Sequence, residues 1–281
     1  PAARLPVELV EMICNELAAL GSTVYRAGSS RWQQDTWHGH LAAAALISRR
    51  WAGPAQTALL RSLFLDSPDE CADFLAAMED HPHLLGLPRS LHFEITNCSV
   101  QACEPYLGVP DFVPILFARC HNVEFVHIYA ELDIGSEGFD DAFSSMRRLR
   151  TFIFESNPTG GESNAWFQTS VRRAPPSLRT LAVQYDVNIE IIFDTPASVE
   201  LLEYHYMGNY PLLLLYDLDD ILDDDPRPIK MAKFALWLEP DLDRDGKPIP
   251  QVSRDRIEHF EAKFAARGVV FQLLELEWNV H

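Results

Sequence analysis

The chain has 281 residues, of which 47% are hydrophobic, and its 23 basic and 41 acidic side chains give a net charge of −18. This length and composition allow one large domain, or a small domain followed by a medium one, with a substantial hydrophobic core. No apolar run approaches the roughly 18 residues needed to span a membrane, and Pro1-Ala2-Ala3-Arg4 lacks the pattern of a secretory signal. We therefore expect a soluble protein without a membrane partner.

The charge is unevenly distributed along the chain. Residues 1–65 contain six Arg and four acids, which leaves 17 basic and 37 acidic residues, a net charge of −20, for residues 66–281. Such a domain repels phosphate backbones, and it has no basic stripe interleaved with aromatic residues. The sequence therefore predicts that the protein does not bind nucleic acid.

The cysteines indicate a reducing compartment. They are odd in number and include no Cys-x2-Cys pair, so neither a disulfide framework nor a zinc site is expected. The five are Cys14, Cys71, Cys98, Cys103 and Cys120. We expect small, buried, reduced side chains in a cytoplasmic or nuclear protein.

Three short helices are predicted at the start of the chain. The first has an apolar residue at every fourth position, in the series Leu5, Leu9, Ile13 and Leu17. Pro6 is tolerated at a first helical position, where its missing N–H would be unpaired anyway. A second helical segment covers residues 41–51, and the apolar period restarts in residues 55–63 after a break at Gly53-Pro54.

Two strings in this head, Leu5-Pro6-x-Glu8-Leu9-x3-Ile13-x3-Leu17 and Ala45-Leu46-Ile47-Ser48-Arg49-x-Trp51, resemble the F-box, the module that connects substrate receptors to SCF ubiquitin ligases. The link between the first two helices, residues 21–39, is longer than is usual for the family. The resemblance implies binding to a Skp-family adaptor, which is acidic, and through it to a cullin scaffold. By resemblance, the residues on or supporting that surface are Leu5, Pro6, Leu9, Ile13, Ile47 and Trp51.

After residue 65 a short apolar strand of the form Leu-x-x-Leu-x-Leu recurs between helical segments. The clear copies are Val123-x2-Val126-x-Ile128, Leu149-x2-Phe152-x-Phe154, Leu178-x2-Leu181-x-Val183 and Val199-x2-Leu202-x-Tyr204. Weaker copies are Leu91-x-Phe93, Phe234-x-Leu236 and Leu274-x-Leu276. Residues 68–78 and 253–267 have helical patterns, the latter stopped by Gly268. This alternation predicts a parallel curved sheet under a layer of helices.

The junction at residues 61–93 looks like that of fungal F-box proteins with divergent leucine-rich repeats. The predicted fold class is therefore α/β, with an N-terminal three-helix F-box in residues 1–65. An irregular leucine-rich-repeat-like solenoid with a parallel curved sheet follows in residues 66–281. An ordinary α/β domain is the alternative that the irregular repeat spacing leaves open.

Because side chains alternate along a strand, the residues between the covered anchors should line the other face of the sheet. The row after the last anchor of each strand reads Glu94, Tyr129, Glu155, Gln184, His205, Trp237 and Glu277. The row before it reads His92, His127, Ile153, Ala182, Glu203, Ala235 and Glu275. Acids mixed with Tyr and Trp suit a basic, partly apolar peptide. The candidate substrate-binding residues are Tyr129, Glu155, Gln184, Glu203, His205 and Trp237, and ordinary solvated strand surface is the alternative.

No motif predicts an enzyme, a metal or a cofactor. Asp241-x-Asp243-x-Asp245-Gly246 begins like a calcium loop, but Val252 stands where the bidentate Glu is required, so we expect calcium to be dispensable. The acidic run in residues 217–225 is typical of an exposed, self-repelling helix end. The ten His residues are scattered, which favours surface or capping roles. Phosphate-loop, nucleophile-elbow and zinc-helix motifs are absent.

The sequence thus predicts a non-enzymatic substrate-recognition adaptor of an SCF-type E3 ubiquitin ligase. Its F-box would bind the Skp adaptor and its repeats an unknown protein substrate, while other subunits carry out the ubiquitin chemistry. The alternative is a stand-alone repeat scaffold or sensor protein, one that calcium could modulate, without a ubiquitin-ligase role.

Overall fold

The computed structural model of the chain describes eleven segments of it. They are residues 6–24, 40–65, 68–95, 112–130, 138–156, 165–184, 187–206, 211–238, 241–242, 248–249 and 252–275. All structural statements below concern these residues.

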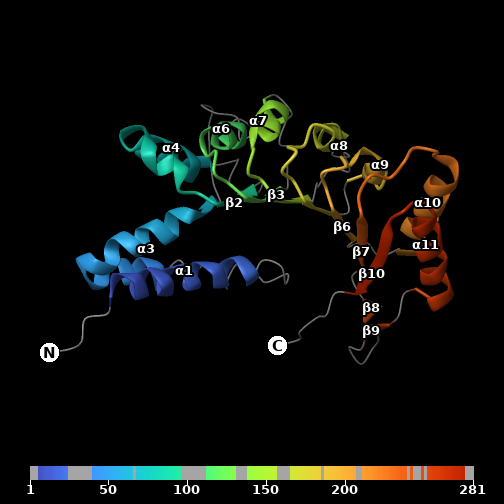
Figure 1. Cartoon of the computed structure of the whole chain (residues 1–281), viewed down its shortest axis with the longest axis horizontal. Coiled ribbons are helices and arrows are strands. Elements are labelled where there is room, and N and C mark those ends of the chain that lie inside the picture. The colour runs from blue at the N-terminus through green and yellow to red at the C-terminus, as the bar shows by residue number, and fades with distance from the viewer. Residues whose placement is uncertain are drawn as a thin grey trace.

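An eight-stranded parallel sheet is the central element, and its strands stand side by side in chain order (Figure 1). The strands are β1 (Ser62–Leu65), β2 (Ser90–Ile95), β3 (Phe125–Ala130), β4 (Thr151–Ser156), β5 (Thr180–Gln184), β6 (Leu201–Tyr206), β7 (Lys233–Leu238) and β10 (Val270–Glu275). A separate antiparallel pair is formed by β8 (Asp241–Leu242) and β9 (Pro248–Ile249). The predicted α/β class with a parallel sheet is confirmed.

Helices cover one face of this sheet (Figure 1). They are α4 (Pro68–Asp80), the 3-10 helix η2 (Pro82–Gly86), α6 (Phe112–Arg119), α7 (Phe139–Ser145), α8 (Ala165–Val171), α9 (Ile191–Asp194), α10 (Pro211–Asp224) and α11 (Arg254–Ala266). The predicted helices at residues 68–78 and 253–267 correspond to α4 and α11. Alternate strand residues such as Val126, Phe152 and Leu181 are fully buried beneath the helices, in one continuous apolar cluster.

A ladder of backbone hydrogen bonds continues the strand pairing into the turns that lead into β2 to β6. The N–H of the residue before each strand donates to the carbonyl of the equivalent residue in the preceding turn, at 2.8 Å in every case. The residues joined in this way form one row, named here the edge row: Arg61, Arg89, Glu124, Arg150, Arg179 and Glu200. Because the ladder fixes the backbone, the side chains of the edge row stand at defined neighbouring positions.

The head contains three helical segments, but their boundaries differ from the prediction. They are α1 (Val7–Val24), residues 40–47 and α3 (Arg49–Arg61). The break falls at Ser48, whose backbone is extended, and not at Gly53-Pro54, because α3 continues through Pro54. The helical period assigned to residues 55–63 also ends early, since Ser62–Leu65 forms β1 of the sheet.

In the last strand, β10, the residues that face the helices are not the ones predicted. Phe271 is buried under the helices, whereas Leu274, predicted as a covered anchor, pairs with Trp237. Gln272, not Glu275, stands beside Ala235. Glu277 lies outside the described residues. A shift by an odd number of residues exchanges the two faces of a strand, so the prediction that Glu275 lies on the open side beside Ala235 was wrong.

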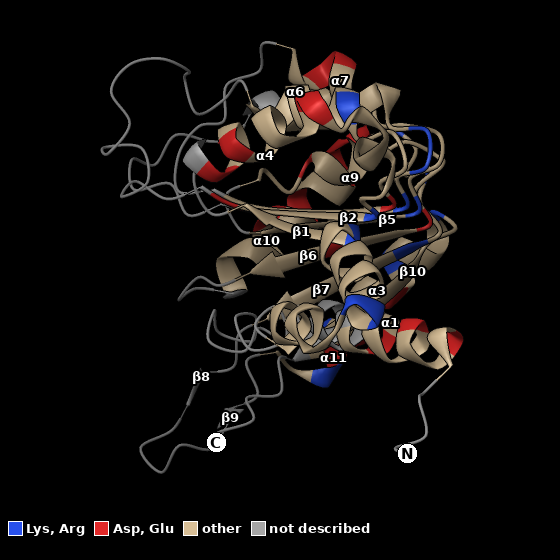
Figure 2. Cartoon of the chain, turned by 90° about the vertical axis from the view of Figure 1, so that its left-hand side faces the viewer, with Lys and Arg blue, Asp and Glu red and all other residues tan. Residues whose placement is uncertain are grey.

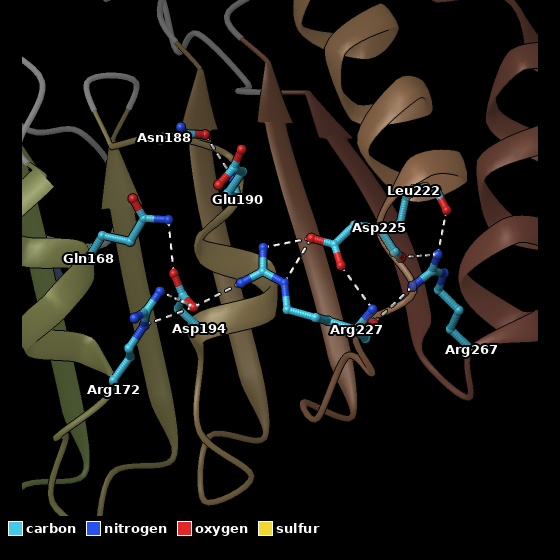
Figure 3. Close-up of polar contacts among 9 residues, drawn as sticks. All are labelled: Gln168, Arg172, Asn188, Glu190, Asp194, Leu222, Asp225, Arg227 and Arg267. Carbon is cyan, nitrogen blue, oxygen red and sulfur yellow. Dashed lines mark hydrogen bonds and ion pairs between the residues drawn. The ribbon is translucent and has the colours of Figure 1, made fainter.

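Asp194 at the end of α9 joins three parts of the helical layer (Figure 3). Its buried carboxylate accepts hydrogen bonds from Gln168 Nε2 at 2.9 Å and Arg172 Nε at 2.9 Å, both on α8 or just after it. Arg227, in the segment before β7, approaches the same carboxylate at 3.4 Å and also pairs with Asp225. Arg267 binds the carbonyls of Asp225 and Leu222, which extends the network to the end of α11.

Replacing Asp194 by Asn should destabilise the fold. The amide keeps the shape of the side chain but loses the negative charge that pairs with Arg172 and Arg227. We expect a loss of about 2 kcal/mol in the free energy of unfolding, because hydrogen bonds to buried charged groups are costly to break. Chemical denaturation measures the free energy of unfolding of each variant. The control is Arg254→Ala, which removes a solvent-exposed pair with Glu258 on α11 and should cost less than about 0.5 kcal/mol. Equal effects would contradict a special role for Asp194.

Candidate functional site

The face of the sheet opposite the helices, named here the open face, carries the predicted substrate-binding residues. Strand register places Glu94, Tyr129 and Glu155 side by side on β2, β3 and β4. It does the same for Gln184, His205 and Trp237 on β5, β6 and β7. Glu203 stands in the adjacent row, beside Ala182 and Ala235. The structure thus brings all six candidates onto one face, half-buried and not packed under the helices.

The N-terminal end of the open face is aromatic. The Phe64 ring of β1 stacks on His92 with ring centroids 4.5 Å apart, and His92 meets His127 edge to face at 6.1 Å. Both histidines are buried, so the expected surface or capping role is wrong for them. The alternation of side chains along β2 and β3 predicts which face of the sheet these two histidines occupy. Their residue type alone would suggest an exposed side chain.

Glu155 occupies the middle of the open face and is flanked by two histidines. Its carboxylate lies 3.4 Å from His127 Nε2. Partial burial by itself would raise the pKa of Glu155, but the contact with His127 and the charge of His205 outweigh that effect and lower the pKa. Glu155 is therefore an anion at neutral pH and presents a negative charge at the centre of the face.

His205 and Trp237 form the aromatic end of the open face toward β7. Their rings stack with centroids 5.5 Å apart, and His205 Nε2 lies 3.6 Å from the Glu203 carboxylate. The ring nitrogens His205 Nε2 and Trp237 Nε1 are shielded from solvent and have no hydrogen-bond partner among the described residues.

The head exposes large apolar side chains. Of the residues predicted from the F-box resemblance, Pro6, Leu9 and Ile47 are exposed, Ile13 and Trp51 are half-buried, and Leu5 lies outside the described residues. Leu9 is 39% exposed and Ile47 67%. Sequence reasoning missed three further exposed residues, Val7, Met12 and Leu46, of which Leu46 is 88% exposed. The buried face of the head instead consists of small or medium residues: Val10, Cys14, Leu41, Ala44, Ala55 and Ala58.

No group of His, Cys, Asp or Glu in the described part of the chain is arranged to hold a metal. Asp241 belongs to β8, while Asp243 and Asp245 of the calcium-like string lie outside that part. Cys14, Cys71 and Cys120 are buried, as predicted. Burial raises the pKa of the Cys120 thiol to about 12, which makes it an unreactive core residue.

The acidic run on α10 holds two helices together, and the prediction of a self-repelling end is wrong for part of it. Asp219 pairs with Lys263 and, at 2.8 Å, with His259, both on α11, and Asp223 pairs with Lys263 at 2.7 Å. Asp217, Asp220 and Asp224 are exposed. Burial by itself would raise the pKa of Asp219, but Lys263 and His259 outweigh it and hold the pKa below the ordinary value of 3.8.

A lowered pKa stabilises the fold above the ordinary pKa, and that stability is lost as pH falls through the pKa of the folded state. We expect Asp219→Asn to reduce the free energy of unfolding by about 1 kcal/mol at pH 7, since the pair is partly solvated. The difference from the wild type should shrink below the ordinary pKa of 3.8. Urea denaturation of both proteins across this pH range measures the difference in the free energy of unfolding. Asp220→Asn, at an exposed neighbour with no ion pair among the described residues, is the control, and a pH-independent difference would contradict the assignment.

None of the helices in the described segments combines the length and apolar character needed to cross a membrane. Comparison of the chain with family models finds no match, and no curated protein matches it significantly.

Proposed function

We propose that the chain is a non-enzymatic substrate-recognition adaptor of an SCF-type E3 ubiquitin ligase. Its head binds a Skp-family adaptor and, through it, a cullin scaffold, and its open face binds the substrate protein. The observation that carries this proposal is the set of exposed apolar side chains in the head, at and around the positions singled out by the F-box resemblance.

The exposed head residues are costly unless a partner covers them. Val7, Leu9, Met12, Leu46 and Ile47 are each more than a third exposed, although the same three helices bury alanine and cysteine in their own core. Burial of a large apolar side chain contributes about 1.5 to 3 kcal/mol. Apolar groups that a fold leaves outside its own core are typical of a protein-binding surface.

The open face supplies the second binding surface. Its half-buried acids, Glu94, Glu155 and Glu203, alternate with the aromatic residues Tyr129 and Trp237. Carboxylates attract and orient a basic segment, and aromatic side chains provide the anchors that dominate binding energy. The matching substrate segment is basic and partly apolar, as expected from the sequence.

The adaptor role is tested by truncating exposed head residues. Leu9→Ala with Ile47→Ala should weaken binding to a purified Skp-family adaptor at least about a hundredfold, because each lost side chain is worth about 1.5 kcal/mol or more. Isothermal titration calorimetry measures the affinity, and both positions are exposed enough for the fold to survive.

A matched control exists on α10. Leu212 and Leu213 are 52% and 58% exposed, so Leu212→Ala with Leu213→Ala removes comparable apolar surface far from the head. Adaptor binding should be unchanged in this control. If the wild-type chain does not bind the adaptor, the SCF role is wrong and the stand-alone scaffold becomes the better interpretation.

The substrate role of the open face is tested with random peptides selected on the immobilised chain. Selected peptides should be rich in Lys and Arg, and Tyr129→Ala with Trp237→Ala should weaken their binding at least about tenfold, because aromatic anchors carry much of the binding energy. Glu155→Gln with Glu203→Gln should do the same by removing the charge. The matched control is Glu79→Gln with Glu258→Gln, on exposed helix surfaces. Acidic consensus peptides, or binding that survives both double variants, would contradict the proposal.

A further inference from the structure

A group of three arginines lies at the end of the sheet where the strands begin. Arg147, Arg148 and Arg150 are exposed, in the turn between α7 and β4 or directly before β4. They take part in no ion pair among the described residues, whereas arginines in neighbouring turns do. In Figure 2 the ribbon of the turns at the right-hand side of the view is coloured blue at several Lys and Arg positions.

The edge row explains why Arg150 lacks a partner. Arg89 pairs with Glu124 at 3.5 Å, and Arg179 pairs with Glu200 at 3.3 Å. Arg150 stands between these two pairs, with Glu124 on one side and Arg179 on the other in the backbone ladder. Neighbouring strands lie about 4.8 Å apart, and like charges at facing positions destabilise a sheet. The edge row from Arg89 to Glu200 therefore contains three arginines and two acids, and both acids are already paired with other arginines.

Arg179 cannot move away to relieve this repulsion without losing contacts. Its Nη1 donates to the carbonyls of Pro176, Leu178 and Ser198 at 3.0 to 3.1 Å. The arginines of the turn after α8 are likewise engaged, Arg172 with Asp194 at 2.9 Å (Figure 3) and Arg173 with Asp140 at 3.7 Å. Arg147, Arg148 and Arg150, named here the arginine turn, remain exposed and without an ion pair among the described residues.

We propose that the arginine turn is a docking surface for an acidic segment of a partner protein. A guanidinium presents a planar fork of N–H donors that matches a carboxylate, and three of them lie within four residues of sequence. The rest of the domain is strongly acidic and repels such a segment, but at physiological ionic strength charges are screened beyond about 8 Å. An acidic segment therefore binds at this turn and is disfavoured elsewhere on the domain.

This surface is separate from the head and from the open face, because the edge row lies at the ends of the strands. The proposal goes beyond the adaptor function and does not depend on it. Failure of the Skp-adaptor experiment or of the peptide selection would leave it standing, and its own failure would leave those proposals standing.

Fluorescence anisotropy with labelled octaglutamate, on the full chain at about 0.15 M ionic strength, tests the proposal. We expect measurable binding to the wild type and a loss of at least about tenfold in affinity for Arg147→Glu with Arg150→Glu, from the loss of exposed ion pairs and the new repulsion. Arg147→Gln with Arg150→Gln removes charge without reversing it and should give an intermediate loss. Thermal unfolding confirms that each variant is folded.

The control is Arg50→Glu with Arg254→Glu, which changes the net charge equally at exposed sites outside the turn. Its affinity for octaglutamate should stay within about twofold of the wild type, because distant charges are screened. Three results would overturn the proposal: no binding to the wild type, an equal loss in the control, or tighter binding of a single-stranded oligonucleotide of the same charge. The last result would indicate a nucleic-acid ligand instead of an acidic protein.

Discussion

The hydrogen bonding of each strand to its neighbours in the chain is the constraint from which the other features follow. All eight strands are parallel and stand in chain order, so every connection has to return over the sheet to start the next strand at the same end. The connections return as helices over one face, and alternate side chains such as Phe152 and Phe154 must then be buried beneath them. The remaining side chains are forced onto the opposite face, which is why Glu155 and its neighbours lie in rows.

Phe64 links the head to this sheet. It belongs to β1, yet it packs against the small core of the head, which contains Ala55 and Ala58 of α3. Because α3 ends at Arg61 and β1 begins at Ser62, no linker separates the two parts. The same ring stacks on His92, so the core of the head is continuous with the aromatic end of the open face. A head coupled in this way holds any protein bound to it in a defined direction relative to the sheet.

The predictability of each element depended on how many independent signals its sequence contains. The covered positions of β3 to β6 were correctly predicted because all four strands repeat the same Leu-x-x-Leu-x-Leu spacing, even where the residue between the last two anchors is apolar, as Ile153 is. The prediction for β10 failed because Leu273 and Leu274 are adjacent apolar residues, and either phase satisfies the pattern. The phase is seen in the register with β7, which places Phe271 beside Phe234 and Leu273 beside Leu236 under the helices.

Local and tertiary signals also competed in the head. Pro54 suggested a helix break that tertiary packing overrides, since the neighbouring Ala55 is buried against α1 in the core of the head. Ser48 has the residue type favoured before a helix and marks the actual boundary. The open-face candidates were placed correctly because they depend only on strand alternation. The exposure of Leu46 and the ion pairs of Asp219 depend on how distant segments pack together, which no local pattern contains.

The distribution of charge follows from the same topology, but only in part. Each helix that returns over the sheet places its C-terminal end near the start of the next strand, where its dipole favours cations. This accounts for a general preference for Arg in the turns. It does not account for Arg150, whose two neighbours in the edge row, Glu124 and Arg179, are paired with Arg89 and Glu200 instead. Among the described residues the arginine turn therefore holds exposed positive charges that no ion pair within the fold uses.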